Sequence, residues 1–248
     1  MKRKLNWQVF LGVLLIALSA LVYIIHYLIF RDAHHIFIYL IGDIGFVFFE
    51  VLLVTLVLHH LLHFREKKAM LNKLNMVIGA FFSEVGTDLL KTFSVFDNEA
   101  FKITQKLIIK NDWSEKEFAK ICKTVKSHNY NIDSKRGNLE DVKQLLREKR
   151  HFLINLLENP NLLEHESFTN LLWAVFHLAE ELAHRRSLEG LEDTDYQHLA
   201  GDIKRVYHLL IAEWLEYMKH LKSDYPYLFS LAIRTNPFDT NASVEIKR

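Results

Sequence analysis

Residues 7–30 read WQVFLGVLLIALSALVYIIHYLIF, and residues 36–62 read IFIYLIGDIGFVFFEVLLVTLVLHHLL. The first stretch carries no formal charge, and as a helix it would span about 36 Å, more than a hydrocarbon core of about 30 Å. The second stretch is equally apolar apart from Asp43 and Glu50. Because only residues 31–35 separate them, we expect an antiparallel transmembrane helical hairpin over residues 1–63.

A secretory signal peptide is the competing interpretation of the first stretch. Residues 2–4 are basic, and residues 17–19 are small enough for a cleavage site. However, apolar sequence continues well beyond Ala20, whereas the apolar core of a signal peptide is about 7–15 residues long. We therefore expect an uncleaved membrane span.

Basic residues predict the orientation of the hairpin. Residues 2–4 are basic, and residues 65–73 contain further lysines and an arginine, whereas the connection holds Arg31 alone. The positive-inside rule then places both termini in the cytoplasm. We expect a multi-pass protein of the cytoplasmic (inner) membrane.

Two acidic residues interrupt the second span. Asp43 and Glu50 are seven residues apart and share one helical face. A charge at the bilayer centre costs about 2.5–3.5 kcal/mol, so neither should face lipid while charged. In a tight hairpin Tyr23 lies level with Asp43 and could donate its hydroxyl, while Ser19 lies about one turn from the level of Glu50.

Three explanations remain open for Glu50. Desolvation could keep it protonated, several hairpins could surround it with a wet cavity or pore, or it could hydrogen-bond across a helix interface. The interfacial hydrogen bond is the simpler explanation, and a proton or cation path is the functional one. Gly42 and Gly45 permit the close helix approach that either explanation requires.

The composition of the chain excludes several classes of protein. Its 248 residues contain 8 Gly and 3 Pro, which disfavours a turn-rich β fold. Residues 64–248 carry equal numbers of basic and acidic side chains, so we expect no nucleic-acid partner. No phosphate-binding loop or nucleophile motif occurs, and no cofactor is predicted. The single cysteine, Cys122, lies on an apolar helical stripe and should be buried.

Helical periodicity continues through the rest of the chain. Residues 64–96 should form a helix that continues from the second span, and residues 97–248 one cytoplasmic helical bundle, so the predicted fold class is all-α. Within that bundle we expect helices over residues 97–109, 114–127, 139–157, 167–186, 195–222 and 226–233, the second of which begins with a capping box of Ser114 and Glu117.

A stripe of small and amide side chains follows one side of the helix over residues 64–96. Such a stripe lets a second helix approach closely, either within the chain or in another subunit. The stripe consists of Asn72, Asn75, Gly79, Ser83 and Gly86.

Fourteen histidines prompt the question of a metal site. Glu181 and His184 form an E-x-x-H step, the spacing by which di-iron bundles present two ligands to one metal. On a helical wheel, however, His177, Glu181 and His184 point away from the apolar side of their helix. A solvated polar face is the favoured explanation, and a metal site between subunits at His177, Glu181 and His184 is the alternative.

Asp195, His198 and Asp202 share a face near the start of the next predicted helix. Acidic residues there interact favourably with the helix dipole, and we prefer this explanation to a binding role.

Short segments of the chain resemble a known family. Gly42-Asp43-Ile44, Glu50-Val51-Leu52 and the closing Tyr225-Pro226-Tyr227-Leu228-Phe229-Ser230 are similar to segments of a family of uncharacterised prokaryotic two-span membrane proteins. The resemblance covers most of the chain. It implies no established activity and therefore transfers no site residues.

The leading functional hypothesis is a homo-oligomeric membrane assembly that conducts cations or protons past Asp43 and Glu50, with the bundle as its assembly or gating domain. The alternative is a non-conducting membrane anchor whose bundle binds a cytoplasmic protein partner. A metal-dependent enzyme is a third hypothesis. The expected partners are thus the lipid bilayer, further copies of the chain and a cytoplasmic protein.

Overall fold

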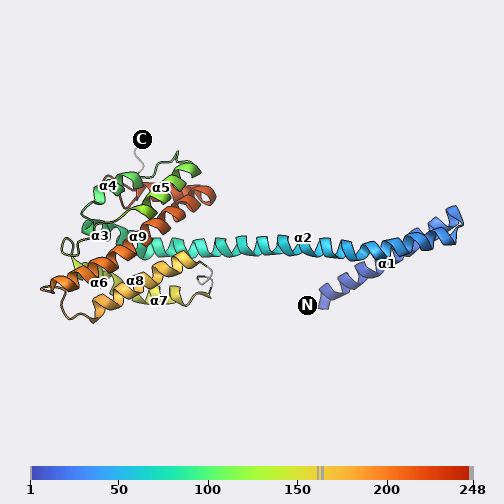
Figure 1. Ribbon diagram of the computed structural model, residues 1–248, viewed down its shortest axis with the longest axis horizontal. Coiled ribbons are helices and arrows are strands. Elements are labelled where there is room, and N and C mark those ends of the chain that lie inside the picture. Colours follow the sequence, from blue (N-terminus) through green and yellow to red (C-terminus); the bar gives the residue numbers. More distant parts are fainter. Residues whose placement is uncertain (1, 161, 163–164, 246–248) are drawn as a thin grey trace. The chain divides into compact units, whose positions relative to one another are not determined.

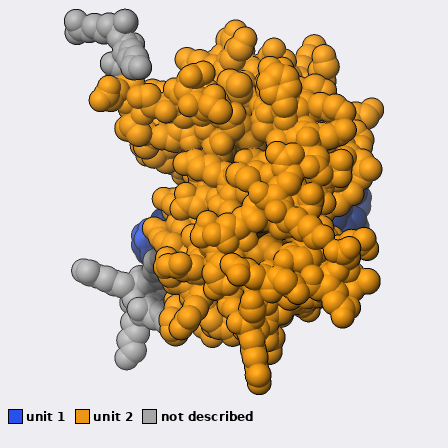
Figure 2. Space-filling model, turned by 90° about the vertical axis from the view of Figure 1, so that its left-hand side faces the viewer, with its two compact units in different colours: residues 1–67 blue, residues 68–248 orange. Residues whose placement is uncertain are grey.

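The computed structural model describes residues 2–160, 162 and 165–245. The chain divides into two compact units, residues 1–67 and 68–248 (Figure 2). Throughout the described residues the regular structure is helical, and the one isolated β-bridge pairs Asp97 with Ile132. The predicted all-α class is confirmed.

The first unit contains α1 (Lys2–Phe30) and the beginning of α2 (Ala33–Phe81). The segments Val9–Phe30 and Ala33–Lys67 are long and apolar enough to cross a membrane, and their side chains are not buried within the protein. The connection is shorter than predicted because Asp32 Oδ1 accepts a hydrogen bond from the His35 amide at 3.2 Å and so caps α2 early. Arg31 takes the left-handed conformation (φ 46°) at this turn.

In the second unit, α2 continues into a π-helical turn, η1 (Phe82–Gly86), and then α3 (Thr87–Phe96). The hydroxyl of Thr87 donates to the Phe82 carbonyl at 2.7 Å and so stabilises the wide turn. Gly86 is required there, since a Cβ atom at this position would lie 2.6 Å from the Phe82 ring and 2.8 Å from the Phe81 ring. The helix predicted over residues 64–96 is therefore present. The π turn within it changes the helical register of the residues that follow.

The remaining helices cover residues 100–234. They are α4 (Ala100–Thr104), which is followed by the 3₁₀ turn η2 (Gln105–Leu107), α5 (Glu115–Ser127), α6 (Leu139–Glu148), α7 (Arg150–Leu157), α8 (Glu166–His184), α9 (Asp193–Asp224) and α10 (Pro226–Arg234) (Figure 1). The capping box predicted for α5 is present, since the hydroxyl of Ser114 and the carboxylate of Glu117 each accept from the other's backbone amide.

The long helix α9 organises the second unit. It packs against α3, α5, α8 and α10, and most of the residues on its inner face are fully buried. The buried face of α8 consists of the apolar residues that the helical wheel assigns to it, among them Phe168, Val175 and Leu178. The predicted helix over residues 139–157 is interrupted at Lys149, whose ψ of 3° departs from helical geometry.

Candidate metal centre

The candidate site lies between α8 and α9, inside the second unit. The loop of residues 185–192 joins the two helices and reverses the direction of the chain. Gly190 in this loop has a positive φ of 69°, which glycine adopts readily. A short connection makes neighbouring helices antiparallel. The end of α8 and the beginning of α9 consequently lie side by side.

Each helix contributes a histidine and a carboxylate with the same spacing. His177 and Glu181 are four residues apart on α8, and His198 and Asp202 are four residues apart on α9. Side chains at this spacing occupy one helical face. The two pairs meet where the faces adjoin.

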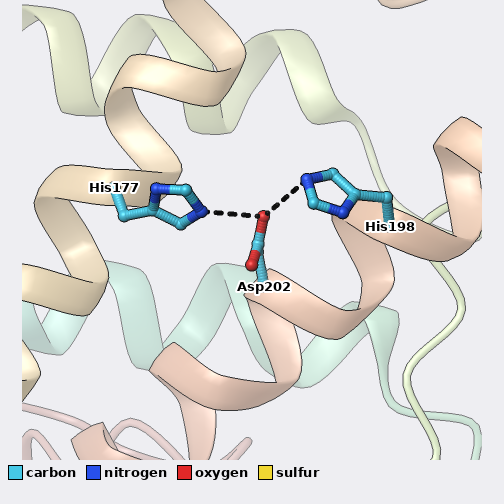
Figure 3. A group of neighbouring side chains, drawn as sticks. All are labelled: His177, His198 and Asp202. Atoms are coloured by element: carbon cyan, nitrogen blue, oxygen red, sulfur yellow. Dashed lines mark ion pairs between the residues drawn. The ribbon is translucent and has the colours of Figure 1, made fainter.

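The two imidazole rings converge on one oxygen of Asp202 (Figure 3). The His177 Nε2 atom lies 3.5 Å from Asp202 Oδ2, and the His198 Nε2 atom lies 3.4 Å from the same oxygen. Among the described residues, these three side chains place their ligand atoms within 4.8 Å of one another. Both imidazoles are thus directed at the Asp202 carboxylate, and the three ligand atoms are close enough to share one ion.

Asp202 is buried, with 3% of its surface exposed. Its Oδ1 atom accepts a hydrogen bond from Arg205 at 3.1 Å. Its Oδ2 atom is buried and accepts no hydrogen bond of normal geometry, although the two imidazoles stand beside it. A buried carboxylate oxygen without a donor is costly, so this atom requires a partner.

Glu181 lies at the edge of the group. Its Oε2 atom is 3.6 Å from His198 Nε2, and its Oε1 atom is 4.0 Å from His177 Nε2. Arg185 donates to Glu181 Oε2 at 2.7 Å, and this hydrogen bond holds the pKa of Glu181 below its ordinary value. Glu181 is therefore an ionised carboxylate within reach of the two imidazoles.

Arg185 also fixes the start of α9. Its Nε and Nη2 atoms donate to the two oxygens of Asp195 at 3.0 and 2.6 Å. Hydrogen bonding to Arg185 lowers the pKa of Asp195, and hydrogen bonding to Asp195 raises the pKa of the guanidinium. This fork ties the end of α8 to the first turn of α9 and thereby holds the ligand faces together.

Two separations in this group match those between ligands of a tetrahedral metal ion. Zinc binds imidazole nitrogen and carboxylate oxygen at about 2.0–2.2 Å, which places neighbouring ligand atoms of a tetrahedral site about 3.3–3.6 Å apart. The separations between Asp202 Oδ2 and the two Nε2 atoms are 3.5 and 3.4 Å. His177, His198 and Asp202 therefore present the donors of a two-histidine, one-carboxylate site, and Glu181 is a further carboxylate beside it.

The structure brings together only part of the metal set considered from the sequence. His177 and Glu181 lie in or beside the group, but His184 is not among the described residues whose ligand atoms gather there. The Nδ1 atom of His184 instead lies 2.8 Å from the Glu180 carbonyl oxygen on its own helix. His198 and Asp202, which sequence reasoning assigned to the helix start, supply the remaining donors. The signal that could have identified them is the H-x-x-x-[D/E] spacing, which occurs on both helices.

The helix-dipole explanation for α9 holds for Asp195 but not for Asp202. Asp195 lies in the first turn. Asp202 lies more than two turns from the beginning of the helix and is buried, where the dipole effect has faded.

The residues singled out in the apolar spans belong to the first unit. Asp43 and Glu50 are exposed on α2, and Ser19 and Tyr23 are exposed on α1. The pairing of Tyr23 with Asp43 and the role of Ser19 stay predictions.

The stripe of small residues is divided by the π turn. Gly79 faces the Tyr217 ring of α9, whose hydroxyl would lie 3.2 Å from an added Cβ atom, and Gly86 faces Phe81 and Phe82. Asn75 is partly exposed and Ser83 is exposed. The side chain of Asn72 lies outside the described residues. Both glycines thus pack within the chain, and a subunit contact at the stripe stays a prediction.

Comparisons with known proteins agree with the two-part organisation. Residues 2–62 match a family described as "MJ1433, N-terminal helical domain", and residues 70–234 match one described as "Uncharacterized protein MJ1433, C-terminal helical domain". The chain is 46% identical over 239 residues to "Uncharacterized protein MJ1433" of Methanocaldococcus jannaschii, and the alignment covers 96% of each protein. No solved structure matches the chain significantly. The resemblance identified from short segments is confirmed, and the chain belongs to the uncharacterised MJ1433 family.

Proposed function

We propose that this protein is a membrane-anchored helical domain that binds a divalent transition-metal ion between α8 and α9. His177, His198 and Asp202 are the proposed ligands. The observation that carries the proposal is the buried Asp202 Oδ2 atom, which faces two imidazole nitrogens at 3.5 and 3.4 Å and has no other donor.

The ligand types favour zinc over magnesium or calcium. Imidazole nitrogen suits zinc and its neighbours in the first transition row, whereas magnesium and calcium prefer oxygen ligands alone. Glu181 is close enough to complete a fourth position, or to hydrogen-bond a metal-bound water. In either arrangement the ion would link α8 to α9 and stabilise the second unit.

A cobalt titration tests the metal site directly. The full chain is purified in detergent, treated with chelator and titrated with Co²⁺, whose visible absorption reports tetrahedral coordination. We expect one equivalent to bind, and His198→Ala to weaken binding by at least about 100-fold, because removing a ligand costs more than removing an outer partner. His184→Ala is the matched control, since this histidine lies on the same helix and outside the group. Equal binding by the wild type and His198→Ala, or no binding by either, would refute the proposal.

The proposed anchor is the hairpin of the first unit, with both termini in the cytoplasm. The support is the length and apolarity of Val9–Phe30 and Ala33–Lys67, together with the basic residues that flank them. Cysteines introduced by His34→Cys and Ser243→Cys test the orientation. An impermeant thiol reagent added outside intact cells should label position 34 and spare position 243. The reverse pattern would contradict the orientation.

A second candidate function is a homo-oligomeric path for cations or protons. Asp43 and Glu50 favour it, because both are exposed on α2 among exposed apolar side chains and need a polar environment inside a bilayer. Flux into liposomes should fall in Asp43→Asn and Glu50→Gln. A strictly monomeric mass in detergent, or unchanged flux in both variants, would exclude this path.

A further inference from the structure

A pocket beside the middle of α9 has a wall whose charges are of one sign. It lies between the loop that follows α5 and one face of α9, within residues 68–248, and its volume is about 340 Å³. Ligand sites in proteins have volumes of about 300–1000 Å³, so this pocket suits a small molecule. None of the proposed metal ligands is among its lining residues.

The charged side chains that line the pocket are both basic. They are Lys204 and Arg205 of α9, and the imidazoles of His128 and His208 line the pocket as well. Among the described residues, no carboxylate lines it. A hollow lined by charges of one sign attracts ligands of the opposite sign, so an anion is favoured here over a cation.

The two cations retain charge and donors for a ligand. Lys204 Nζ donates to Asn129 Oδ1 at 2.7 Å, but this amide is neutral and leaves the charge of the lysine in place. Arg205 donates from Nη1 to Asp202 Oδ1 at 3.1 Å, which uses one of the five N–H donors of a guanidinium. Because 60% of the Arg205 side chain is exposed, its other donors can reach a second partner.

His208 lies in the positive field of neighbouring lysines. Burial lowers its pKa, and the charges of Lys126 and Lys204 lower it further. The ring packs edge to face on Tyr130, with centroids 5.8 Å apart, and its nitrogens form no hydrogen bond with the described residues. An anion beside His208 would offset the two lysine charges and accept a hydrogen bond from the ring.

Two buried carboxylates lie near these residues without forming part of the wall. Asp202 pairs with Arg205. Asp97 accepts hydrogen bonds from two backbone amides at 3.0 and 3.3 Å, and it adds to the effect of burial in raising the pKa of Tyr130. Both carboxylates are almost fully buried and neither lines the pocket, so a bound anion would contact the cations directly.

We propose that this pocket binds a phosphate monoester, whose phosphate group is held by Lys204, Arg205 and His208. Such a group carries a charge of about −1.5 to −2 near pH 7 and has three acceptor oxygens, which match two cations and an imidazole donor. A carboxylate offers one charge and two oxygens. The same phosphate group occurs in small soluble esters and in the lipid phosphatidic acid, and its source is decided by experiment.

Isothermal titration calorimetry with racemic glycerol 3-phosphate tests the assignment, with glycerol as the uncharged counterpart. The full chain is kept in maltoside micelles and 0.15 M sodium chloride, which limits diffuse attraction to about 8 Å. Metal is first removed with a chelator, and the chelator is removed by dialysis. We expect the ester to bind at one site and glycerol not to bind. Lys204→Met should weaken ester binding at least about tenfold, whereas Lys116→Met, which changes an exposed lysine outside the pocket, should leave it unchanged.

A pair of variants at Gly201 tests the role of charge without removing any contact. Gly201 lines the pocket, and a Cβ atom added there meets no atom within 4 Å, so the fold should persist with a longer side chain. Gly201→Glu should weaken ester binding at least about tenfold more than Gly201→Gln, because only the glutamate repels the phosphate group.

Phosphatidic acid added to the same micelles identifies the source of the phosphate group. Suppressed binding of glycerol 3-phosphate would support the pocket with the lipid as its ligand, and unchanged binding would support it with a soluble ester. Absence of ester binding to the wild type, equal affinities for ester and glycerol, or unchanged ester affinity in both Lys204→Met and Gly201→Glu would overturn the assignment. Because metal is absent throughout, none of these outcomes depends on the proposed metal centre.

Discussion

The two oxygens of the Asp202 carboxylate have different surroundings. Arg205 donates to Oδ1 at 3.1 Å, whereas Oδ2 faces the Nε2 atoms of His177 and His198. A buried acceptor without a donor costs about 1–3 kcal/mol. A cation bound between the imidazoles would remove this cost. The argument does not extend to His184, which is not part of the group.

The thiol of Cys122 should be unreactive in the folded protein. Burial raises its pKa to about 11, and the neighbouring Glu216 carboxylate adds to the effect. Thiolate is the reactive form, so alkylation by iodoacetamide at pH 8 should be about 100-fold slower in the folded than in the urea-unfolded chain. Mass spectrometry of timed samples measures both rates. Similar rates in the two states would show that the thiol is accessible.

Arg185 should stabilise the second unit in a pH-dependent way. It holds the pKa values of Glu181 and Asp195 below their ordinary values of 4.5 and 3.8, so near those values the unfolded chain binds more protons than the folded one. The stabilisation is complete above these ordinary values and is lost as the pH falls through the lowered ones. Arg185→Met should therefore cost about 1–3 kcal/mol at pH 7 and less at pH 3.

Urea unfolding of metal-free protein at the two pH values measures this difference. Arg186→Met is the control, because Arg186 is exposed and adjacent in sequence. A loss for Arg185→Met that is equal at pH 7 and pH 3 would contradict the electrostatic explanation.

At the scale of the elements, α2 and α3 are joined by a π turn that depends on a glycine. Gly86→Ala would place its Cβ atom 2.6 Å from the buried Phe82 ring, so we expect a loss of about 1–3 kcal/mol in the free energy of unfolding. Gly201→Ala in α9 meets no atom within 4 Å and should stabilise by about 0.5–1 kcal/mol. Chemical denaturation of both variants checks the opposite signs. A loss of similar size in both would remove the packing argument.

Local patterns predicted the elements better than the site. The capping box of Ser114 and Glu117 joins residues three apart, so α5 could be recognised from its own sequence. The helical wheel also identified the buried face of α8. It placed His177 and Glu181 on the opposite, polar side of α8, but it could not show that α9 packs against that side. The metal group joins residues on two helices, and only the packing of α8 on α9 brings His198 and Asp202 to His177.

At the scale of the whole molecule, metal binding should raise thermal stability. An ion that binds only the folded chain adds about 2.7 kcal/mol when its free concentration is 100-fold above the dissociation constant. Zinc should therefore raise the Tm of the detergent-solubilised wild type by several degrees and leave that of His198→Ala unchanged. Calorimetry with and without zinc measures both, with His184→Ala as the control. An equal rise in His198→Ala would place the ion elsewhere.

The two units should contribute separately to the properties of the chain. The apolar segments Val9–Phe30 and Ala33–Lys67 carry the proposed membrane anchor, whereas the proposed metal ligands lie within residues 68–248. Asp43→Asn and Glu50→Gln should leave the zinc-dependent rise in Tm intact, because no proposed metal ligand belongs to the apolar unit. Calorimetry of the two variants checks this independence.

The most direct measurement is an anomalous difference map, calculated at the zinc absorption edge from crystals of the zinc-loaded full chain. We predict a single strong peak per chain within bonding distance of the Nε2 atoms of His177 and His198 and of Asp202 Oδ2. A stoichiometrically loaded protein whose peak lies elsewhere, or whose map has no peak between α8 and α9, would contradict the proposed metal centre.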